Sequence, residues 1–549
     1  MTSRSAERTV RRRGRPAAPR APKRVNVVRG VSVLDVAVFV GIMLLGLAHL
    51  PTPFHGDQAI NMLMGKVVAS GGSPYVDVWD LKHPGIFFFF GAAGSLFGFT
   101  EIAIHLFELL WMLALALVVR MTAKHLLRSQ IAISLAPALT VGFYYAVATK
   151  QQLTQTEGIV GLPLLLALAS VSAAIRPGSR YPRLLLFLSG LSAGIVFVFK
   201  APYAALPVLF WVLAYVEWRR TRETATTPGA LAVVPLLLGG VLLPVGACVL
   251  YLANKDALDL AWWTFTVHPL EVARETRLGL RRLTESWLWF VLTFRFLLAL
   301  AIIGAADRLR SGWDLLTASL SAWVLGGLVL IWTQVIGWWT YHYMLIFVPL
   351  GLLAALGAEA VWRALTTSAA RTYRRVIVAA ALLVLILVSV SRIAPGVQLL
   401  ADVVRARPLP FTTDHGRAFQ AAQDAEYADA IAITSFLRTP ERQPGPIYVF
   451  GSPLFYVLAD RSPAIAPLAT WFHPTSEAWR WMRDDLVAAS PAYILIADGA
   501  MEFFTYENPA LKEEVRALDV WLHEHYETLP TAAGGTWLVR RDRNDPGLN

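Results

Sequence analysis

The sequence has few of the residues on which many soluble enzymes depend. It holds one cysteine, Cys248, inside an apolar run, so no disulfide can form within the chain, and cysteine usage does not indicate a redox compartment. It also lacks a glycine-rich phosphate-binding loop and the G-x-S-x-G pattern of a serine nucleophile. ATP hydrolysis and serine-nucleophile chemistry therefore have no support in the sequence.

Charged side chains are scarce as well. They make up 16% of the 549 residues, whereas 56% are hydrophobic and the mean hydropathy is +0.51. Such a composition predicts an integral membrane protein built from helices, because lipid cannot satisfy open backbone groups. The net charge of +11 comes largely from the Arg-rich tail and from short loops. It therefore indicates membrane orientation and not nucleic-acid binding.

Eleven apolar runs approach the ~20 residues that a spanning helix needs. They lie at about 32–50, 102–123, 130–148, 158–175, 183–199, 203–218, 230–252, 287–305, 314–335, 343–362 and 375–394. A shorter run, Ile86–Phe99, predicts a re-entrant or interfacial helix. We therefore predict a disordered basic tail over residues 1–30 and an all-α polytopic membrane domain over residues 31–395.

The positive-inside rule gives this domain an orientation. With the N-terminus in the cytoplasm, five inner loops are rich in Arg or Lys, and only the outer loop 253–286 departs from the rule. An odd number of spans then places residues 396–549 outside. These residues are less apolar and alternate short strands, such as 446–451, 492–497 and 536–540, with helical stretches. They predict a small extracytoplasmic α/β domain.

This orientation collects the unusual polar residues on one face of the membrane. The first outer loop, residues 51–101, contains Asp57, Asp77, Asp80, Lys82 and His83. Glu157, Lys200 and His342 lie at the ends of other apolar runs. Each of these residues alone is equally well explained as a snorkelling anchor or a loop charge. The whole set on one side favours an outward-facing site.

Two further interpretations concern the acids. Asp77 and Asp80 have only His83 as a nearby imidazole, and a carboxylate pair alone is weak support for a metal site, so we expect neither a metal nor another cofactor. Asp57 precedes an amphipathic stretch, Gln58–Val68. A helix N-cap is therefore the alternative to a catalytic role for this acid, and the two roles can coexist.

Several short motifs resemble one family of membrane enzymes. Asp57, the G-G-S-P-Y at 71–75 and the D-x-x-D-L-K-H-P at 77–84 resemble the first outer loop of GT-C glycosyltransferases. The group named by this resemblance is the bacterial branch of the dolichyl-phosphate-mannose protein mannosyltransferases and aminoarabinose transferases. The later motifs that fit it are T-E at 156–157, F-K-A-P at 199–202, Y-H-Y at 341–343 and the segment 451–463. Two positions depart from the family pattern: Gln58 replaces a second acid, and His83 replaces a proline.

The resemblance implies transfer of a sugar from a polyprenyl-phosphate carrier to an acceptor glycan, lipid or protein on the outer face. An inverting transfer needs one carboxylate to take the acceptor's proton and cations to stabilise the departing phosphate. Asp57 is then the candidate base, and Lys82, Lys200, His83 and His342 are the candidate phosphate-binding residues. Asp77, Asp80 and Glu157 are the remaining site acids.

Other functions stay open at this stage. A transporter or flippase would use the same outward polar residues as a pathway, but no apolar run carries a paired acid and base, and no broken helix pair recurs in matching halves. A ligase or polymerase acting on lipid-linked oligosaccharides would carry its large outer loop late in the membrane domain. A receptor or scaffold leaves the charged first loop unexplained.

Overall fold

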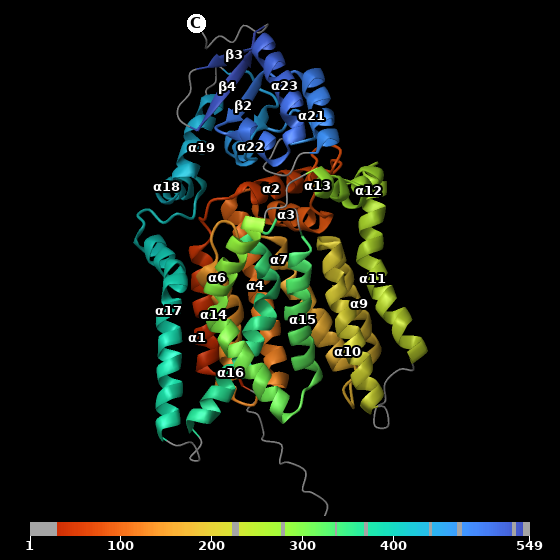
Figure 1. Ribbon diagram of the computed structural model, residues 1–549, viewed down its shortest axis with the longest axis vertical. Coiled ribbons are helices and arrows are strands. Elements are labelled where there is room, and N and C mark those ends of the chain that lie inside the picture. Colours follow the sequence, from red (N-terminus) through yellow and green to blue (C-terminus); the bar gives the residue numbers. More distant parts are fainter. Residues whose placement is uncertain are drawn as a thin grey trace, which may run out of the picture.

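The structure is a computed structural model, and it describes residues 30–221, 230–275, 280–334, 337–366, 372–438, 442–468, 475–529 and 534–541. The tail predicted over residues 1–30 lies, except for Gly30, outside the described residues. The described chain forms a tall helical bundle that carries a small sheet with further helices at one end (Figure 1). We call this end the sheet end.

The bundle contains the helices that the apolar runs predict. Its elements are α1 (Val33–Ala48), α4 (Glu101–Leu126), α5 (Gln130–Pro137) with a π-helical turn and α6 (Phe143–Val147), α7 (Thr156–Ile159), α8 (Gly161–Ala174), α9 (Pro182–Phe199), η2 (Ala201–Ala204), α10 (Ala205–Thr221), α11 (Ala230–Ala253), α14 (Leu280–Ser311), α15 (Leu315–Trp332), η4 (Thr340–Ile346), α16 (Phe347–Thr366) and α17 (Thr372–Arg405). Within the described residues, ten of the resulting helices are long and apolar enough to cross a membrane, and α1 is a shorter apolar helix. The chain is an integral multi-pass membrane protein.

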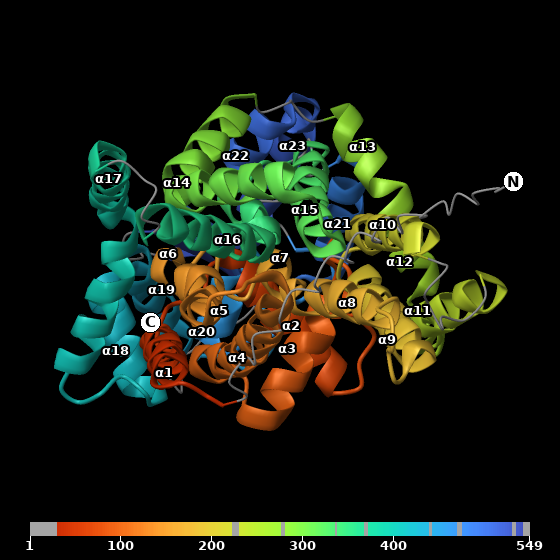
Figure 2. The same cartoon turned by 90° about the horizontal axis from the view of Figure 1, so that it is seen from below.

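Helices in the bundle approach closely where glycine replaces a larger side chain. Gly190 of α9 lies against the backbone of Leu237 in α11, and Gly357 of α16 lies against the backbone of Leu300 in α14. A Cβ atom at either glycine would collide with the opposite carbonyl, so these contacts require glycine, as is common between membrane helices. Seen from below, α9 and α11 lie on one side of the bundle and α17 on the opposite side (Figure 2).

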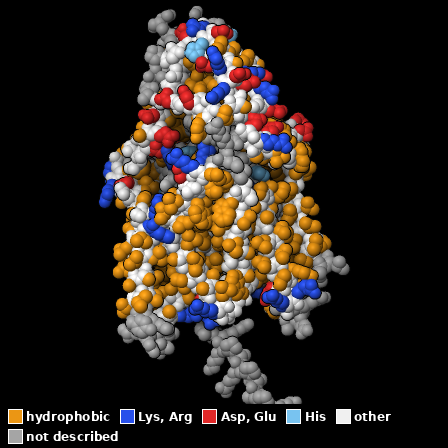
Figure 3. All heavy atoms as spheres, viewed as in Figure 1, with side chains coloured by type: hydrophobic (Ala, Val, Ile, Leu, Met, Phe, Trp, Pro, Cys, Tyr) orange, Lys and Arg blue, Asp and Glu red, His pale blue; other side chains and the backbone are white. Residues whose placement is uncertain are grey.

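The outer surface of the bundle suits a bilayer. A broad band of hydrophobic side chains covers it, with Lys and Arg at the lower rim and mixed charges around the sheet end (Figure 3). On α17, Leu383 and Leu387 are 57% and 62% exposed, which in water would be an unusual apolar surface. Lipid is the solvent that fits this band.

The first connection forms two helices at the sheet end. These are α2 (Gly56–Ala69) and α3 (Pro84–Phe97), which pack on each other and lie across the top of the bundle (Figure 1). Pro84 occupies the first turn of α3, where the missing N–H costs nothing. The predicted short apolar helix is therefore present, and it begins two residues earlier than Ile86.

The C-terminal part is a mixed α/β unit. It contains α18 (Thr413–Gln423), α19 (Ala425–Ser435), η5 (Phe436–Arg438), β1 (Tyr448–Phe450), α20 (Leu454–Ala459), α21 (Ser476–Ala489), β2 (Tyr493–Ala497), α22 (Ala500–Glu507), η6 (Pro509–Leu511), α23 (Lys512–His525), β3 (Tyr526–Leu529) and β4 (Gly535–Arg540). The strand order is β1-β2-β4-β3, with β1 parallel to β2 and the other pairs antiparallel. The three predicted strands are β1, β2 and β4, and β3 was missed because it directly follows α23.

Specific contacts join this unit to the first connection. The backbone N–H of Trp79 donates to the carbonyl of Ala466 at 2.8 Å, and the Tyr427 hydroxyl donates to the buried Glu101 carboxylate, also at 2.8 Å. Two helices of the connection after α11, α12 (Leu258–Thr266) and α13 (His268–Glu275), complete the junction. The α/β unit therefore lies directly over α2 and α3.

Candidate active site

The predicted site residues lie on five separate segments at the sheet end. Asp57 belongs to the first turn of α2, and Asp80 and Lys82 belong to the segment between α2 and α3. Glu157 lies in α7, Lys200 follows α9, and His342 lies in η4. Apart from the α2–α3 segment, these positions are the ends of apolar helices, so the bundle itself brings them to one level.

One lysine joins two carboxylates of the first connection. The Lys82 ammonium lies 3.0 Å from an oxygen of Asp57 and 3.2 Å from an oxygen of Asp80. The backbone N–H of Lys82 also donates to Asp80 at 2.9 Å, which fixes the turn. Asp57 is 8% exposed and Asp80 is 3% exposed, so this charge cluster is largely shielded from water.

The pKa values of the two carboxylates are shifted in opposite directions. Burial favours the neutral form of Asp57, but the adjacent Lys82 ammonium, together with His55, outweighs it and lowers the pKa of Asp57 below its usual value. Burial raises the pKa of Asp80, and the Asp57 charge adds to this effect, although Lys82 opposes it. Burial also lowers the pKa of Lys82, but both carboxylates outweigh it and raise that pKa above the usual value. Asp57 is therefore the stronger acid of the two, and Lys82 stays charged.

A second ion pair lies among the helix ends. The Lys200 ammonium is 2.8 Å from the Glu157 carboxylate and donates to the Gln334 side-chain oxygen at 2.8 Å. The Tyr203 hydroxyl donates to the same Glu157 oxygen at 2.7 Å. Glu157 is 2% exposed, so Lys200 is the cation that compensates a buried carboxylate.

His342 lies between the two ion pairs. Its imidazole is close enough to Asp57, Glu157 and Lys200 for the charge of each to act on it. The residue is 5% exposed, and its Nδ1 atom has no hydrogen-bond partner among the described residues. The hydroxyl of the neighbouring Tyr341 forms a hydrogen bond with the Asp57 carboxylate. Residues of η4 therefore connect the Asp57 cluster with the Glu157 pair.

Two predicted residues have different surroundings. The His83 ring stacks on Phe265 with centroids 4.3 Å apart, and burial, assisted by the charge of Lys200, lowers the pKa of His83 to about 3. His83 is therefore a neutral imidazole at physiological pH. Asp77 is exposed, and its carboxylate accepts from the Ser73 N–H at 2.7 Å, which closes a turn. The structure thus does not bring Asp77 into the cluster.

Tyr75 holds the backbone beneath Lys82. It adopts a left-handed conformation with φ of 72°, which is rare for an aromatic residue, and it is fully buried. Its hydroxyl donates to the Lys82 carbonyl at 2.8 Å. Such strain tends to be found at functional sites. The P-Y of the G-G-S-P-Y segment therefore shapes the loop that presents Lys82.

Sequence reasoning did not assign three residues that contact the predicted set: Tyr203, Gln334 and Tyr341. Each is a polar side chain at the end of an apolar run, which is the signal that identified Lys200 and His342. They were missed because tyrosine and glutamine at a membrane interface are usually anchors. Their partners become evident only when the helix ends are assembled.

The described residues contain no group of three or more His, Cys, Asp or Glu side chains that could hold a metal ion. In the Asp57–Lys82–Asp80 cluster a lysine occupies the position between the carboxylates. Function without a metal stays a prediction. Chemically, the cluster offers an ionised buried carboxylate, which can accept a proton, beside one ammonium group, which can stabilise an anion.

Comparison with known structures defines the fold. The structure of ArnT from Cupriavidus metallidurans bound to undecaprenyl phosphate matches with a TM-score of 0.53 and 16% identity, over 92% of this chain and 97% of that chain. The chain has the GT-C fold. The fold class that the sequence resemblance implies is therefore confirmed, including the α/β unit that follows the GT-C bundle.

Other comparisons add less. The archaeal oligosaccharyltransferase AglB from Archaeoglobus fulgidus, in complex with an inhibitory peptide and a dolichol-phosphate, matches with a TM-score of 0.48 and 12% identity, over 93% of this chain and 75% of that chain. No protein-family model matches the sequence, and no curated protein matches it either. The GT-C fold is thus seen in the structure where sequence comparison finds no relative.

Proposed function

We propose that this protein is a glycosyltransferase that moves a sugar from a polyprenyl-phosphate carrier to an extracytoplasmic acceptor. The observation that carries the proposal is the Asp57–Lys82–Asp80 cluster, in which a buried acid stays ionised next to a shared cation. The GT-C fold supports it, and ArnT, which has this fold, binds undecaprenyl phosphate. The opposite arrangement, a protonated Asp57, would leave the reaction without a base.

The proposed reaction inverts the configuration at the anomeric carbon of the sugar. The acceptor hydroxyl oxygen forms a bond to that carbon while the bond from the carbon to the carrier phosphate oxygen breaks. The hydroxyl proton goes to Asp57, and the bonding electrons leave with the polyprenyl phosphate. Lys82 and Lys200 stabilise the negative charge that develops on this phosphate. His342 donates a hydrogen bond to it, and neutral His83 does so without contributing charge.

Lys82 couples donor binding to the base. In the free site its ammonium is shared by Asp57 and Asp80. A bound carrier phosphate competes for the same ammonium, which weakens its hold on Asp57 and raises the proton affinity of that carboxylate. The acid is then a stronger base when the donor is present than when the site is empty. This arrangement restricts proton transfer to the donor-bound state.

A reconstituted assay tests the proposal. Purified protein in lipid nanodiscs is incubated with undecaprenyl-phosphate-linked hexoses, pentoses and aminopentoses and with cell-envelope fractions as acceptors. We expect release of undecaprenyl phosphate with one donor class, and a matching mass increase in an envelope component from cells that contain this chain. Transport of the intact lipid-linked sugar between leaflets, without cleavage by any acceptor fraction, would contradict the proposal and favour a flippase.

A further inference from the structure

A short loop lies at the centre of the polar contacts behind the site. Residues 149–155, which we call the hub loop, connect α6 to α7 and lead directly into Glu157. Gln152, Leu153 and Thr154 of the hub loop are between 0% and 1% exposed. This part of the loop is therefore buried, whereas Thr149 and Gln151 are exposed.

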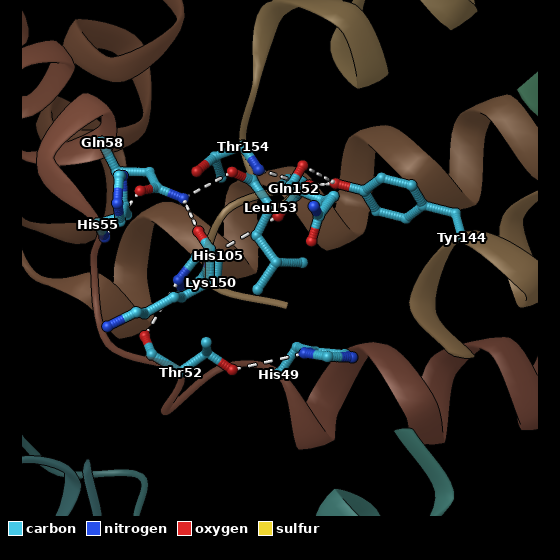
Figure 4. Close-up of polar contacts among 11 residues, drawn as sticks. His49, Thr52, His55, Gln58, His105, Tyr144, Lys150, Gln152, Leu153 and Thr154 are labelled. Carbon is cyan, nitrogen blue, oxygen red and sulfur yellow. Dashed lines mark hydrogen bonds and ion pairs between the residues drawn. The ribbon is translucent and has the colours of Figure 1, made fainter. Parts of the chain in front are cut away.

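Gln58 attaches α2 to the hub loop. Its amide nitrogen donates to the carbonyls of Lys150 at 2.5 Å and Leu153 at 2.8 Å, and its amide oxygen accepts from the His55 N–H at 2.8 Å (Figure 4). The Gln58 side chain is 0% exposed. The two hydrogen bonds to Lys150 and Leu153 are made next to Asp57, so the first turn of α2 cannot shift relative to the hub loop without breaking them.

Gln152 makes the equivalent connection to η4. Its amide nitrogen donates to the Thr340 hydroxyl at 2.9 Å, and its amide oxygen accepts from the N–H and the hydroxyl of Thr149 within the hub loop. Thr340 directly precedes Tyr341 and His342. The hub loop therefore contacts the two segments that hold Asp57 and His342, the first through its backbone carbonyls and the second through the Gln152 side chain.

The hub loop is itself held in an unfavourable conformation. Thr154 has a φ of 51°, the left-handed region that a β-branched residue rarely adopts. The buried Glu108 carboxylate of α4 accepts from the Thr154 N–H at 3.0 Å and from the Tyr144 hydroxyl at 2.5 Å. Membrane helices α4 and α6 thus impose the shape of the loop.

Lys150 connects the hub loop to the C-terminal unit. Its carbonyl accepts from Gln58, whereas its ammonium lies 2.6 Å from Asp424, the N-cap of α19, and 2.8 Å from Glu426 in the first turn of α19. Burial lowers the pKa of Lys150, but these two carboxylates outweigh it and raise that pKa, so the ion pairs persist over the physiological pH range. One residue therefore contacts both the catalytic helix and the α/β unit.

From these contacts we propose that the hub loop sets the spacing between the proposed base and the phosphate-binding residues, with Gln58 and Gln152 as positioning residues. This inference rests on the proposed function. Neither glutamine reaches the reacting atoms: each fixes a segment that does. A misplacement of about 1 Å in such a segment can reduce turnover about 10²-fold, so loss of either connection lowers turnover more than donor affinity.

The inference also explains why position 58 carries an amide. A carboxylate at this position could accept from the His55 N–H, but it could not donate to the two carbonyls, and its charge would face both carbonyl oxygens. Gln58→Glu, which restores the acid pair of the resembled family, should therefore damage the site. If the side chain at position 58 took part in the chemical step instead, the Gln58→Glu variant would be at least as active as the natural protein.

The test compares Gln58→Leu, Gln58→Glu and Gln152→Leu with Gln420→Leu, a change of an equally buried glutamine in α18. Hydrogen–deuterium exchange of the full-length protein in nanodiscs is the first readout. We expect at least tenfold faster exchange over 56–61 in both Gln58 variants, over 340–346 in Gln152→Leu, and unchanged rates in these segments in Gln420→Leu. Unchanged exchange in the Gln58 and Gln152 variants would overturn the inference whatever the enzyme activity.

Turnover of the undecaprenyl-phosphate sugar that proves to be the donor is the second readout. The expected result is a kcat that falls at least tenfold in both Gln58 variants and in Gln152→Leu, with donor KM within about twofold of the natural protein. An active Gln58→Glu, or a loss that lies wholly in KM, would also overturn the inference. If no donor is turned over by the natural protein, the proposed function fails, and the exchange data still decide whether the hub loop positions α2 and η4.

Discussion

At the scale of single residues, the sharing of one cation by two carboxylates governs the site. Lys82 lowers the pKa of Asp57, while burial raises that of Asp80, so the environment separates two chemically identical acids. The sequence places these residues in one loop but cannot show which acid has the lower pKa. That distinction depends on burial and on the direction of the Lys82 side chain, which only the folded chain defines.

The pH dependence of turnover follows from this sharing. Asp57 must be ionised to act as a base, and because its pKa in the free protein lies below the usual value for an aspartate, kcat/KM should be lost only at a pH below that usual value. In Lys82→Met the lowering charge is gone and burial raises the pKa, so turnover should be lost at a higher pH, by more than one unit. The measurement is kcat/KM against pH, which reports the pKa of the free protein, with Lys82→Arg as the charge-preserving control. Coincident acid limbs for the natural protein and Lys82→Met would contradict this role of Lys82.

Lys200 provides a second residue-scale prediction. It compensates the buried Glu157 and is proposed to contact the carrier phosphate. Lys200→Met should raise the donor concentration needed for half-maximal turnover at least tenfold. The control is Lys66→Met: Lys66 lies on α2 and forms an exposed ion pair with Asp460, so its loss should leave that concentration within about twofold. Protein abundance in the membrane is measured in parallel, because Glu157 loses its partner. A normal donor requirement in well-expressed Lys200→Met would remove Lys200 from the phosphate site.

At the scale of elements, an acid in α13 holds the C-terminal unit in place. One oxygen of Glu275 accepts from the Ser476 N–H at 2.8 Å, the Ser476 hydroxyl at 2.9 Å and the Asn508 amide at 2.9 Å. Ser476 begins α21, so the carboxylate also meets the positive end of that helix dipole. We infer that this contact, together with the Lys150 ion pairs, fixes the α/β unit over the site.

Removing that acid should loosen the junction without unfolding the bundle. Glu275→Leu deletes the acceptor of three hydrogen bonds and should lower the local opening free energy of α21 by about 2 kcal/mol. Hydrogen–deuterium exchange over 476–489 measures this, and exchange over α16, which lies in the bundle core, is the internal control. Equal exchange in α21 of the variant and the natural protein would show that the junction does not depend on Glu275.

The elements also show what the sequence could and could not predict. The bundle helices were predictable because bilayer thickness sets the length of an apolar run. The pairing of Glu157 with Lys200, 43 residues away, was not, because it depends on how α7 and η2 pack. Gln58 was noticed only as a departure from an acid pair. Its partners lie 92 and 95 residues along the chain, and no local pattern identifies them.

At the scale of the whole molecule, the fold places the first connection and the C-terminal unit at the same end of the bundle, whichever side of the membrane that end faces (Figure 1). The Arg- and Lys-rich loops predict that this end is extracytoplasmic, and Lys and Arg gather at the opposite rim (Figure 3). The proposed function requires this orientation, because the acceptor is proposed to be extracytoplasmic.

Reporter fusions test the orientation. An alkaline phosphatase fused after residue 549 should be active, and a fluorescent protein that matures only in the cytoplasm should be dark at the same position. A fusion after residue 222, in an inner loop, should give the reverse result and serves as the matched control. A cytoplasmic reporter that is active after residue 549 would place the whole polar site on the wrong side for the proposed reaction.

The most direct test of the account is the turnover of purified Asp57→Asn in nanodiscs, measured as undecaprenyl phosphate released from the accepted donor. Asparagine preserves the size of the side chain, and the N-cap of α2 is His55 and not Asp57, so the predicted cap role is wrong. A merely structural role, in which Asp57 interacts with the helix dipole from the first turn, would cost about 1 kcal/mol or less and leave turnover nearly normal. A catalytic base predicts a loss of at least about 10²-fold in kcat, with folding and donor binding preserved. Near-normal turnover by Asp57→Asn would contradict the account and leave Asp80 or Glu157 as the candidate base.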